Sequence, residues 1–346
     1  MTRLPPYRAP RWLRNPHLQS ALASSRLRRI TGGRRARAIE TRSEEHLLDC
    51  GDGVRLLGRF NAQSALPASR GLVMLFHGWE GSTASSYLLR TGAQLLDAGF
   101  DVFRLNFRDH GDTHHLNPGI FHSCRIDEVV GAVAAVQRQW RPPFLGVSGF
   151  SLGGNFALRV ALRAPAAGVA LHHAVAICPI LSPPNGLIAM EQSPWFYQHY
   201  FMLKWGASLR RKRELFPEAL PAELTSGNGV RDLTRRLIEH VGDFDSLEDY
   251  LNGYSVAGQR LAALQVPVSI LTAADDPIIP VTDFEQLRLP ANARLDIAEH
   301  GGHCGFLLDT RLNSYAEHYV TQRMLDASAA ASQQHRAGAD ETALAG

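Results

Sequence analysis

The fold of this chain is decided at residues 144–155, which read FLGVSGFSLGGN. The apolar run Phe144–Gly149 predicts a strand buried on both faces, and the apolar spacing of Leu152–Arg163 predicts a helix. Between them, Gly149-Phe150-Ser151-Leu152-Gly153 has the pattern G-x-S-x-G. In this strand-to-helix context the pattern is typical of a nucleophile elbow, a sharp turn that presents a serine at a helix N-terminus. Small flanking residues are expected because the chain approaches itself closely there.

The same alternation of strand and helix extends outward from this turn. Strands are predicted at Glu45–Cys50, Val54–Phe60, Gly71–His77, Asp101–Asn106, His173–Cys178, Val266–Thr272 and Arg294–Ala298. Helices are predicted at Ser85–Ala98, Ile126–Trp140, Asp283–Leu287 and Thr310–Leu325. The order indicates an α/β protein with a mostly parallel central sheet flanked by helices.

One long segment interrupts the alternation after the sixth strand. Residues 179–255 are too many for a plain loop and have helix-like, charged stretches, so we interpret them as a helical lid. The predicted organisation is a basic N-terminal arm at 1–42, a core at 43–178 and 256–325, the lid at 179–255, and a flexible tail at 326–346. Aromatic residues of the lid either line an apolar acyl pocket or form ordinary core between lid and body: Trp195, Phe196, Tyr197, Tyr200, Phe201 and Trp205.

A serine nucleophile needs a base and an acid that orients the base. Asp275 and Asp276 follow the strand that ends at Thr272, and His300 and His303 follow the strand that ends at Ala298. The chain order serine, aspartate, histidine matches the α/β-hydrolase arrangement. We favour Asp276 over Asp275 because residues 276–280 have the pattern D-x-x-I-P. We favour His303 over His300 because neighbouring glycines allow the loop of His303 to reach the turn at Ser151.

The oxyanion of such a reaction needs two backbone N–H donors. The residue after the nucleophile, Leu152, supplies one, and we assign the other to Trp79 in the loop after the strand Gly71–His77.

The histidine-rich segment Arg108–His115, with His122 further on, lacks a metal-binding pattern. We interpret it as a polar loop near the active-site mouth, with Arg108 and Asp109 paired, and predict neither a metal nor a cofactor.

Composition excludes several classes of protein. With 346 residues, 45% of them hydrophobic, and only 4 cysteines, the chain is neither disordered nor a disulfide scaffold, and we expect a cytoplasmic location. No stretch is apolar enough for a transmembrane helix. Residues 1–42 hold 11 arginines and one acid, Glu40. This arm is either a solvated extension that packs in part through Trp12, Pro16, Leu18 and Leu22, or a contact for an anionic membrane surface. No nucleic acid partner is expected.

Several motifs together resemble the YheT-like branch of the α/β-hydrolases, which is related to the eukaryotic α/β-hydrolase-domain lipases and esterases. They are residues 15–20 (NPHLQS), 77–82 (HGWEGS), 106–111 (NFRDHG), 149–155 (GFSLGGN), 275–277 (DDP) and 300–303 (HGGH). The resemblance runs from about residue 10 to 325. It implies an α/β-hydrolase fold and carboxylic-ester hydrolysis, with the triad at Ser151, Asp276 and His303.

The prediction is therefore a serine hydrolase that acts on a small-molecule ester or lipid with a hydrophobic acyl group. Two alternatives remain: an acyltransferase of the same fold, and a non-catalytic protein that binds lipid or nucleic acid through the basic arm. The presence of all three triad residues argues against the second alternative.

Overall fold

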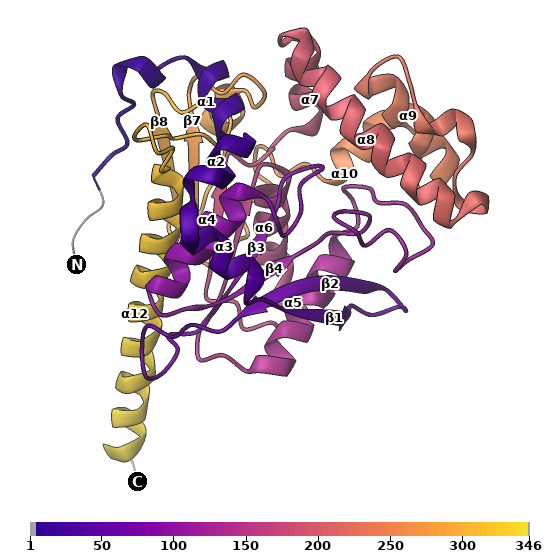
Figure 1. Cartoon of the computed structure of the whole chain (residues 1–346). Coiled ribbons are helices and arrows are strands. Elements are labelled where there is room, and N and C mark those ends of the chain that lie inside the picture. The colour runs from indigo at the N-terminus through magenta and orange to yellow at the C-terminus, as the bar shows by residue number, and fades with distance from the viewer. Residues whose placement is uncertain (1–4, 345–346) are drawn as a thin grey trace.

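The computed structural model describes residues 5–344; the side chains of residues 26, 33–35 and 334–344 are not among those described. The described chain forms one eight-stranded sheet in the order β1-β2-β4-β3-β5-β6-β7-β8 (Figure 1). The strands are β1 Glu44–Asp49, β2 Arg55–Asn61, β3 Leu72–Phe76, β4 Asp101–Leu105, β5 Leu145–Phe150, β6 His173–Ile177, β7 Val268–Ala273 and β8 Ala293–Ala298. β2 is antiparallel to both of its neighbours, and all other pairs are parallel. The predicted fold class, a mostly parallel α/β-hydrolase sheet, is confirmed.

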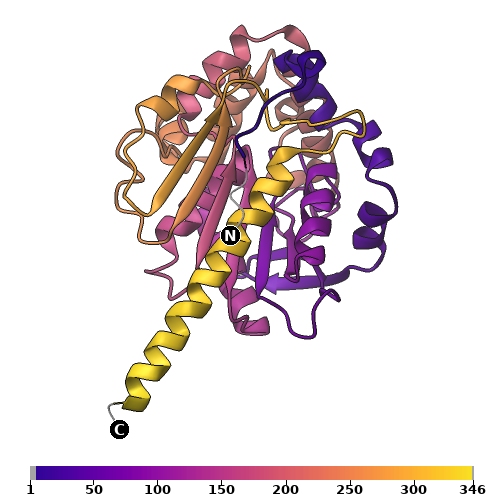
Figure 2. The ribbon, with the colours of Figure 1, turned by 90° about the vertical axis from the view of Figure 1, so that its left-hand side faces the viewer.

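Helices cover both faces of the sheet. α5 (Ile126–Trp140) and α6 (Leu152–Arg163) bury their apolar faces against one side. α4 (Ser86–Asp97) and α12 (Tyr315–Leu344) pack on the other, and Figure 2 shows α12 running along that face and extending past it. Because both faces are covered, every residue of β3 and β5 is buried, which explains their continuous apolar runs.

The helix α12 is longer than the sequence predicts. We expected it to end at Leu325 and a flexible tail to follow at 326–346, but the helix continues to Leu344. Residues 326–346 are rich in alanine, the strongest helix former, so the same composition that suggested a frayed end also sustains a helix. Residues 345–346 lie outside the described chain. No helix within residues 5–344, α12 included, is long and apolar enough to cross a membrane.

Between β6 and β7 the chain forms a separate helical layer at the carboxyl ends of the strands (Figure 1). It consists of α7 Pro183–Gln192, α8 Trp195–Leu215, η2 Pro217–Ala219, η3 Ala222–Thr225, α9 Val230–Val241 and α10 Leu247–Gly253, and α11 (Val281–Glu285) follows β7. Leucines of α8, η3 and α9 share a small core of their own with Ile120. This layer is the segment that we interpret as a lid.

The basic arm is folded rather than extended. It forms η1 Arg11–Leu13, α1 Pro16–Ala23, α2 Arg26–Thr31 and α3 Gly33–Thr41; its residues 1–4 lie outside the described chain. It packs on the body through Leu13, Gln19, Arg28 and Ile39, which are at most 2% exposed. The prediction that Trp12 and Leu18 pack was wrong: they are 49% and 40% exposed. The apolar pattern of so short a helix did not reveal which face the body covers.

A buried ion pair fixes the arm to the body. The Arg28 guanidinium lies 2.5 Å from the Glu317 carboxylate of α12, and both side chains are 1% exposed. Arg90 of α4 donates to the same carboxylate at 3.1 Å. One carboxylate therefore accepts hydrogen bonds from two buried guanidinium groups that belong to different elements.

We expect Glu317→Ala to lower the free energy of unfolding by about 3–5 kcal/mol, since it leaves buried charges without a partner. Urea denaturation of full-length protein measures this. The matched control is Glu239→Ala, which removes an exposed i,i+4 partner of Arg235 on α9 and should leave the denaturation midpoint unchanged. Equal midpoints for both variants would contradict the assignment of Glu317 as the residue that holds the arm.

Candidate active site

Ser151 occupies the predicted sharp turn between β5 and α6. Its backbone has φ 54° and ψ −118°, a strained combination for a residue with a side chain. A Cβ at Gly149 would lie 2.0 Å from the carbonyl oxygen of Gly153, and one at Gly153 would lie 2.4 Å from that of His77. Both flanking positions therefore admit only glycine. This steric limit explains the two glycines of the G-x-S-x-G pattern.

The structure brings the favoured acid and base to this serine. His303 Nε2 lies 2.9 Å from Ser151 Oγ, and His303 Nδ1 lies 2.8 Å from Asp276 Oδ2. Asp276 is fully buried, and its other oxygen accepts the backbone N–H groups of Ile278 and Ile279. With Nδ1–H donating to this fixed carboxylate, Nε2 is left to accept the serine proton.

The same carboxylate controls the protonation of the base. Burial is the largest single influence and lowers the pKa of His303. The charge and hydrogen bond of Asp276, together with the neighbouring Cys304, outweigh it and hold the pKa of His303 well above its usual range. The imidazolium form is thus stabilised at the position where it would appear during proton transfer from Ser151.

The two alternatives left open by the sequence, Asp275 and His300, lie together and away from the serine. Asp275 Oδ1 accepts the backbone N–H of Gly302 at 2.9 Å, and Asp275 Oδ2 lies 3.4 Å from His300 Nδ1. Asp275 therefore supports the loop that carries His303, and neither alternative contacts Ser151 in the structure.

The backbone N–H groups of Trp79 and Leu152 are available at the same place. Both residues line one pocket with Ser151 and His303. Leu152 begins α6, so its N–H has no acceptor within the helix. Within the described chain, neither N–H donates to a protein acceptor.

Buried side chains fix the loop that carries Trp79. Phe107 N–H donates to His77 Nε2 at 3.2 Å, so His77 Nδ1–H donates to the carbonyl of Gly78 at 2.8 Å. Gly78 N–H donates to the Tyr87 hydroxyl oxygen at 2.9 Å. We did not predict Tyr87 from the sequence, because nothing in the pattern of α4 distinguishes it from an ordinary core residue.

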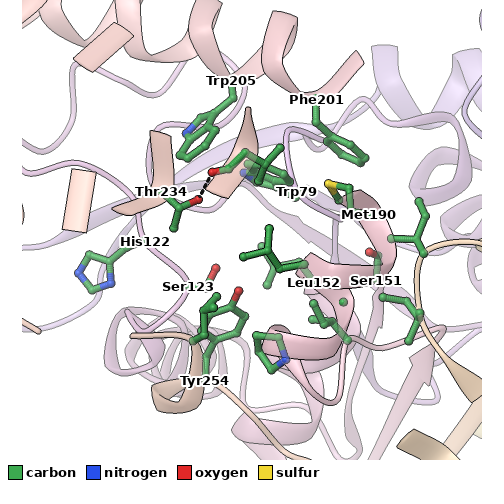
Figure 3. A pocket seen from close by; sticks show the side chains of 18 of the residues that line it. Trp79, His122, Ser123, Ser151, Leu152, Met190, Phe201, Trp205, Thr234 and Tyr254 are labelled. Carbon is green, nitrogen blue, oxygen red and sulfur yellow. Dashed lines mark hydrogen bonds between the residues drawn. The ribbon is translucent and has the colours of Figure 1, made fainter. Parts of the chain in front are cut away.

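An apolar pocket opens beside Ser151 (Figure 3). The lid supplies much of its wall, and Figure 3 shows Phe201 and Trp205 reaching into it from α8. Apolar side chains dominate the lining: Trp79, Phe121, Leu152, Ile180, Leu187, Met190, Phe201, Trp205, Val230, Leu251, Ile278 and Ile279. A pocket with so apolar a lining suits a hydrophobic group next to the Ser151 hydroxyl.

The lid aromatics divide between the two roles considered for them. Phe201 and Trp205 line the pocket, whereas Tyr197 is buried against the arm, with its hydroxyl hydrogen-bonded to His17 Nδ1 at 3.1 Å. The other three, Trp195, Phe196 and Tyr200, are 74%, 42% and 44% exposed. They therefore neither line the pocket nor form core between lid and body.

The arm also contributes to the site, which the sequence did not predict. His303 N–H donates to Ser20 Oγ at 2.8 Å, and Leu307 N–H donates to Gln19 Oε1 at 2.8 Å. Both acceptors belong to α1 and are buried. They hold the two ends of the turn that presents His303, so the segment 15–20 that carries part of the family resemblance fixes the position of His303.

The histidine-rich loop differs from its prediction in one respect. Arg108 and Asp109 are not paired with each other: Arg108 binds Glu128 of α5, and Asp109 accepts from Lys212 of the lid at 2.7 Å. All four side chains are largely buried. Adjacent residues in this turn point to different layers, so the loop joins body and lid.

Within the described chain, one group of side chains could hold a metal ion, and it lies outside the histidine-rich loop. Cys178, His303 and Cys304 place one ligand atom each within 4.8 Å of one another. Both ring nitrogens of His303 already contact Ser151 and Asp276, so a metal here would compete with those contacts. Of the histidine-rich loop, His114 Nε2 is hydrogen-bonded to Ser208.

Residues 72–314 match the model of the alpha/beta hydrolase family. The chain belongs to this family. The match spans β3 to the loop before α12 and includes Ser151, Asp276 and His303. Among curated proteins, this family member is similar to the protein named "Putative esterase YheT" of Escherichia coli (strain K12), with 28% identity over 276 residues, 76% of this chain and 78% of the relative. This similarity agrees with the predicted YheT-like branch.

Solved structures of other hydrolases share the fold of this family member. A 2,6-dihydroxy-pseudo-oxynicotine hydrolase aligns with a TM-score of 0.57 and 16% identity over 85% of this chain and 70% of its own. A proline iminopeptidase of Mycobacterium smegmatis aligns with a TM-score of 0.53 and 17% identity over 83% and 100%. At such identities the likeness concerns the fold alone. Family membership together with the named esterase relative supports a hydrolase.

Proposed function

We propose that this chain is a serine hydrolase that cleaves carboxylic esters with a hydrophobic acyl group. The observation that carries the proposal is the position of His303, which bonds Ser151 through one ring nitrogen and buried Asp276 through the other. This pair of contacts lies at the wall of an apolar pocket. The similarity to a protein named as an esterase supports the ester bond as the target.

The proposed reaction has two steps. His303 takes the proton of Ser151 as its oxygen attacks the ester carbonyl, and the N–H groups of Trp79 and Leu152 stabilise the oxyanion. The alcohol leaves with the proton from His303, and Ser151 remains acylated. Water, deprotonated by His303, then releases the carboxylic acid and restores the serine. No cofactor takes part in these steps.

Product analysis with wild-type protein tests the proposal. p-Nitrophenyl esters of several chain lengths should yield p-nitrophenol and free carboxylic acid, and a fluorophosphonate should label the protein. If an added alcohol captured most of the acyl group, the acyltransferase alternative would replace hydrolysis. If folded protein showed neither turnover nor labelling, the proposal would be wrong.

The pocket should set the acyl length. Thr234 of α9 is half-buried and lines the pocket, so Thr234→Trp is expected to fill part of it. We expect kcat/KM for a decanoate ester to fall by about tenfold or more, while the value for an acetate ester stays within about threefold. The control is Arg235→Trp, which adds the same side chain on the exposed side of the helix. A parallel loss for both esters would argue against an acyl role for this cavity.

The pH profile should reflect the raised pKa of His303. Only the neutral imidazole accepts the serine proton, so kcat/KM is expected to rise with pH through that pKa, with a midpoint above about 6.5, the ordinary histidine value. Rates for a short, soluble ester from pH 5 to 10, corrected for spontaneous hydrolysis, give the midpoint. A midpoint below that of an ordinary histidine would show that Asp276 does not control the base.

A further inference from the structure

One face of α8 is exposed and strongly apolar. Trp195, Phe196, Tyr200 and Leu203 are 74%, 42%, 44% and 58% exposed. At 100° per residue they form a single stripe along the first half of the helix. The opposite stripe includes Phe201 and Trp205, which line the pocket. The helix therefore presents apolar side chains outward as well as inward, and the outward set has no core to join.

The second half of the same exposed face is basic. Arg210, Arg211 and Arg213 are exposed, and the sole acidic residue of α8, Glu214, is hydrogen-bonded to Arg211. Of the acidic groups elsewhere near this helix, Glu191 is held by two bonds from Arg231. The face is thus an apolar stripe continued by a cluster of positive charge.

The arm extends this surface. Trp12 and Leu18 are exposed, and so are the neighbouring Arg8, Arg11 and Arg14. α1 lies beside the start of α8, because the His17 ring meets the Phe196 ring edge-on at 6.2 Å and bonds Tyr197. Figures 1 and 2 both place α1 and the lid at the same end of the molecule. Residues 1–39 contain no aspartate or glutamate, so no acid of this segment offsets its arginines.

We propose that this composite surface, the exposed face of α8 together with η1 and α1, docks on an anionic lipid bilayer. Tryptophan, phenylalanine and leucine side chains partition into the boundary between headgroups and acyl chains, while lysine and arginine attract anionic headgroups. Long basic side chains also bury their stems and keep their charge at the headgroup level. The surface thus combines the two kinds of side chain that such a contact uses, exposed aromatic and leucine side chains and exposed arginines.

A second copy of this chain fits the surface less well. A two-fold contact would place the same patch on both copies, so that two surfaces of the same positive charge would be brought together. Anionic headgroups supply the opposite charge instead. Docking would place α8 between the bilayer and the pocket. The docking proposal does not depend on the proposed function. A further step, that the substrates are lipid esters taken from the bilayer, does rest on it.

The test is co-sedimentation of full-length protein with phosphatidylcholine vesicles containing about 30% phosphatidylglycerol, against pure phosphatidylcholine vesicles. We expect clear binding to the anionic vesicles, at least about tenfold weaker binding to the neutral ones, and loss of binding at about 0.5 M NaCl. Replacing Trp195 and Leu203 by serine, or Arg11 and Arg14 by glutamate, should each weaken binding to anionic vesicles by about tenfold or more.

The matched control is Leu47→Ser, which removes a 49% exposed leucine from β1 and should leave vesicle binding unchanged. Turnover of a short, soluble ester without vesicles checks that each variant is folded and reports on the proposed function separately. Absent binding, or equal binding by all variants, would overturn the proposal. A dimer in solution that Leu203→Ser dissociates would assign the surface to a second copy instead.

Discussion

The Ser151→Ala variant is expected to lose ester turnover by a factor of about 10⁴ or more and to lose fluorophosphonate labelling completely. The reason is that the proposed first step forms a bond to Ser151 Oγ, and among the described residues no other hydroxyl is hydrogen-bonded to His303 Nε2. Alanine is smaller than serine and adopts the strained backbone no less readily, so the fold should persist. Initial rates with a p-nitrophenyl ester and near-ultraviolet circular dichroism measure both quantities.

The control for this variant is Ser226→Ala, at an exposed position in the lid far along the chain from the elbow. It should label and turn over like the wild type. Residual activity above about one per cent in a folded Ser151→Ala protein would mean that another group is the nucleophile, and the serine-hydrolase proposal would fall.

The second large effect is expected from Asp276→Asn. An amide at this position carries no charge and can donate to His303 Nδ1, which favours the wrong tautomer of the ring. We expect kcat to fall by about 10³–10⁴-fold with little change in stability, because Oδ1 of asparagine can still accept from Ile278 and Ile279. The remaining activity should also shift its acid limb to lower pH, since the charge that raises the pKa of His303 is gone.

The neighbouring carboxylate offers a matched comparison. Asp275→Asn keeps an oxygen that can accept the N–H of Gly302, and Asp275 does not contact His303 through its side chain. We expect its kcat to stay within about tenfold of wild type. The reverse ranking of the two variants would show that Asp275 is the functional acid.

The parts of the site that could be predicted from the sequence are those that depend on local geometry. The turn at Ser151 requires small residues on both sides whatever the rest of the protein does, because a Cβ at Gly149 or Gly153 would collide with nearby backbone. Acid and base follow the ends of β7 and β8, and the carboxyl ends of parallel strands meet at one edge of the sheet. The positions of Ser151, Asp276 and His303 directly after predicted strands therefore indicated that these three distant residues lie close together.

One error and one omission share a cause. The predicted pairing of Arg108 with Asp109 was wrong because the turn directs these two neighbouring side chains to different layers of the protein. Arg108 instead binds Glu128, 20 residues away, and Asp109 binds Lys212, 103 residues away. The hydrogen bonds that Gln19 and Ser20 accept could not be predicted for the same reason, because these residues lie more than 280 positions from the backbone groups they bind.

By itself, the sequence determined the sharp turn at Ser151, the alternation that makes the sheet, and the order of Ser151, Asp276 and His303 at the ends of successive strands. Those features arise from steric limits and periodicity within short segments. Only the tertiary structure decided that Asp276 rather than Asp275 holds His303, which lid aromatics line the pocket, and that the arm supports the His303 turn. These outcomes depend on which side chains distant segments place within hydrogen-bond or van der Waals reach, and the energies of such contacts are set by burial, which a single sequence does not reveal.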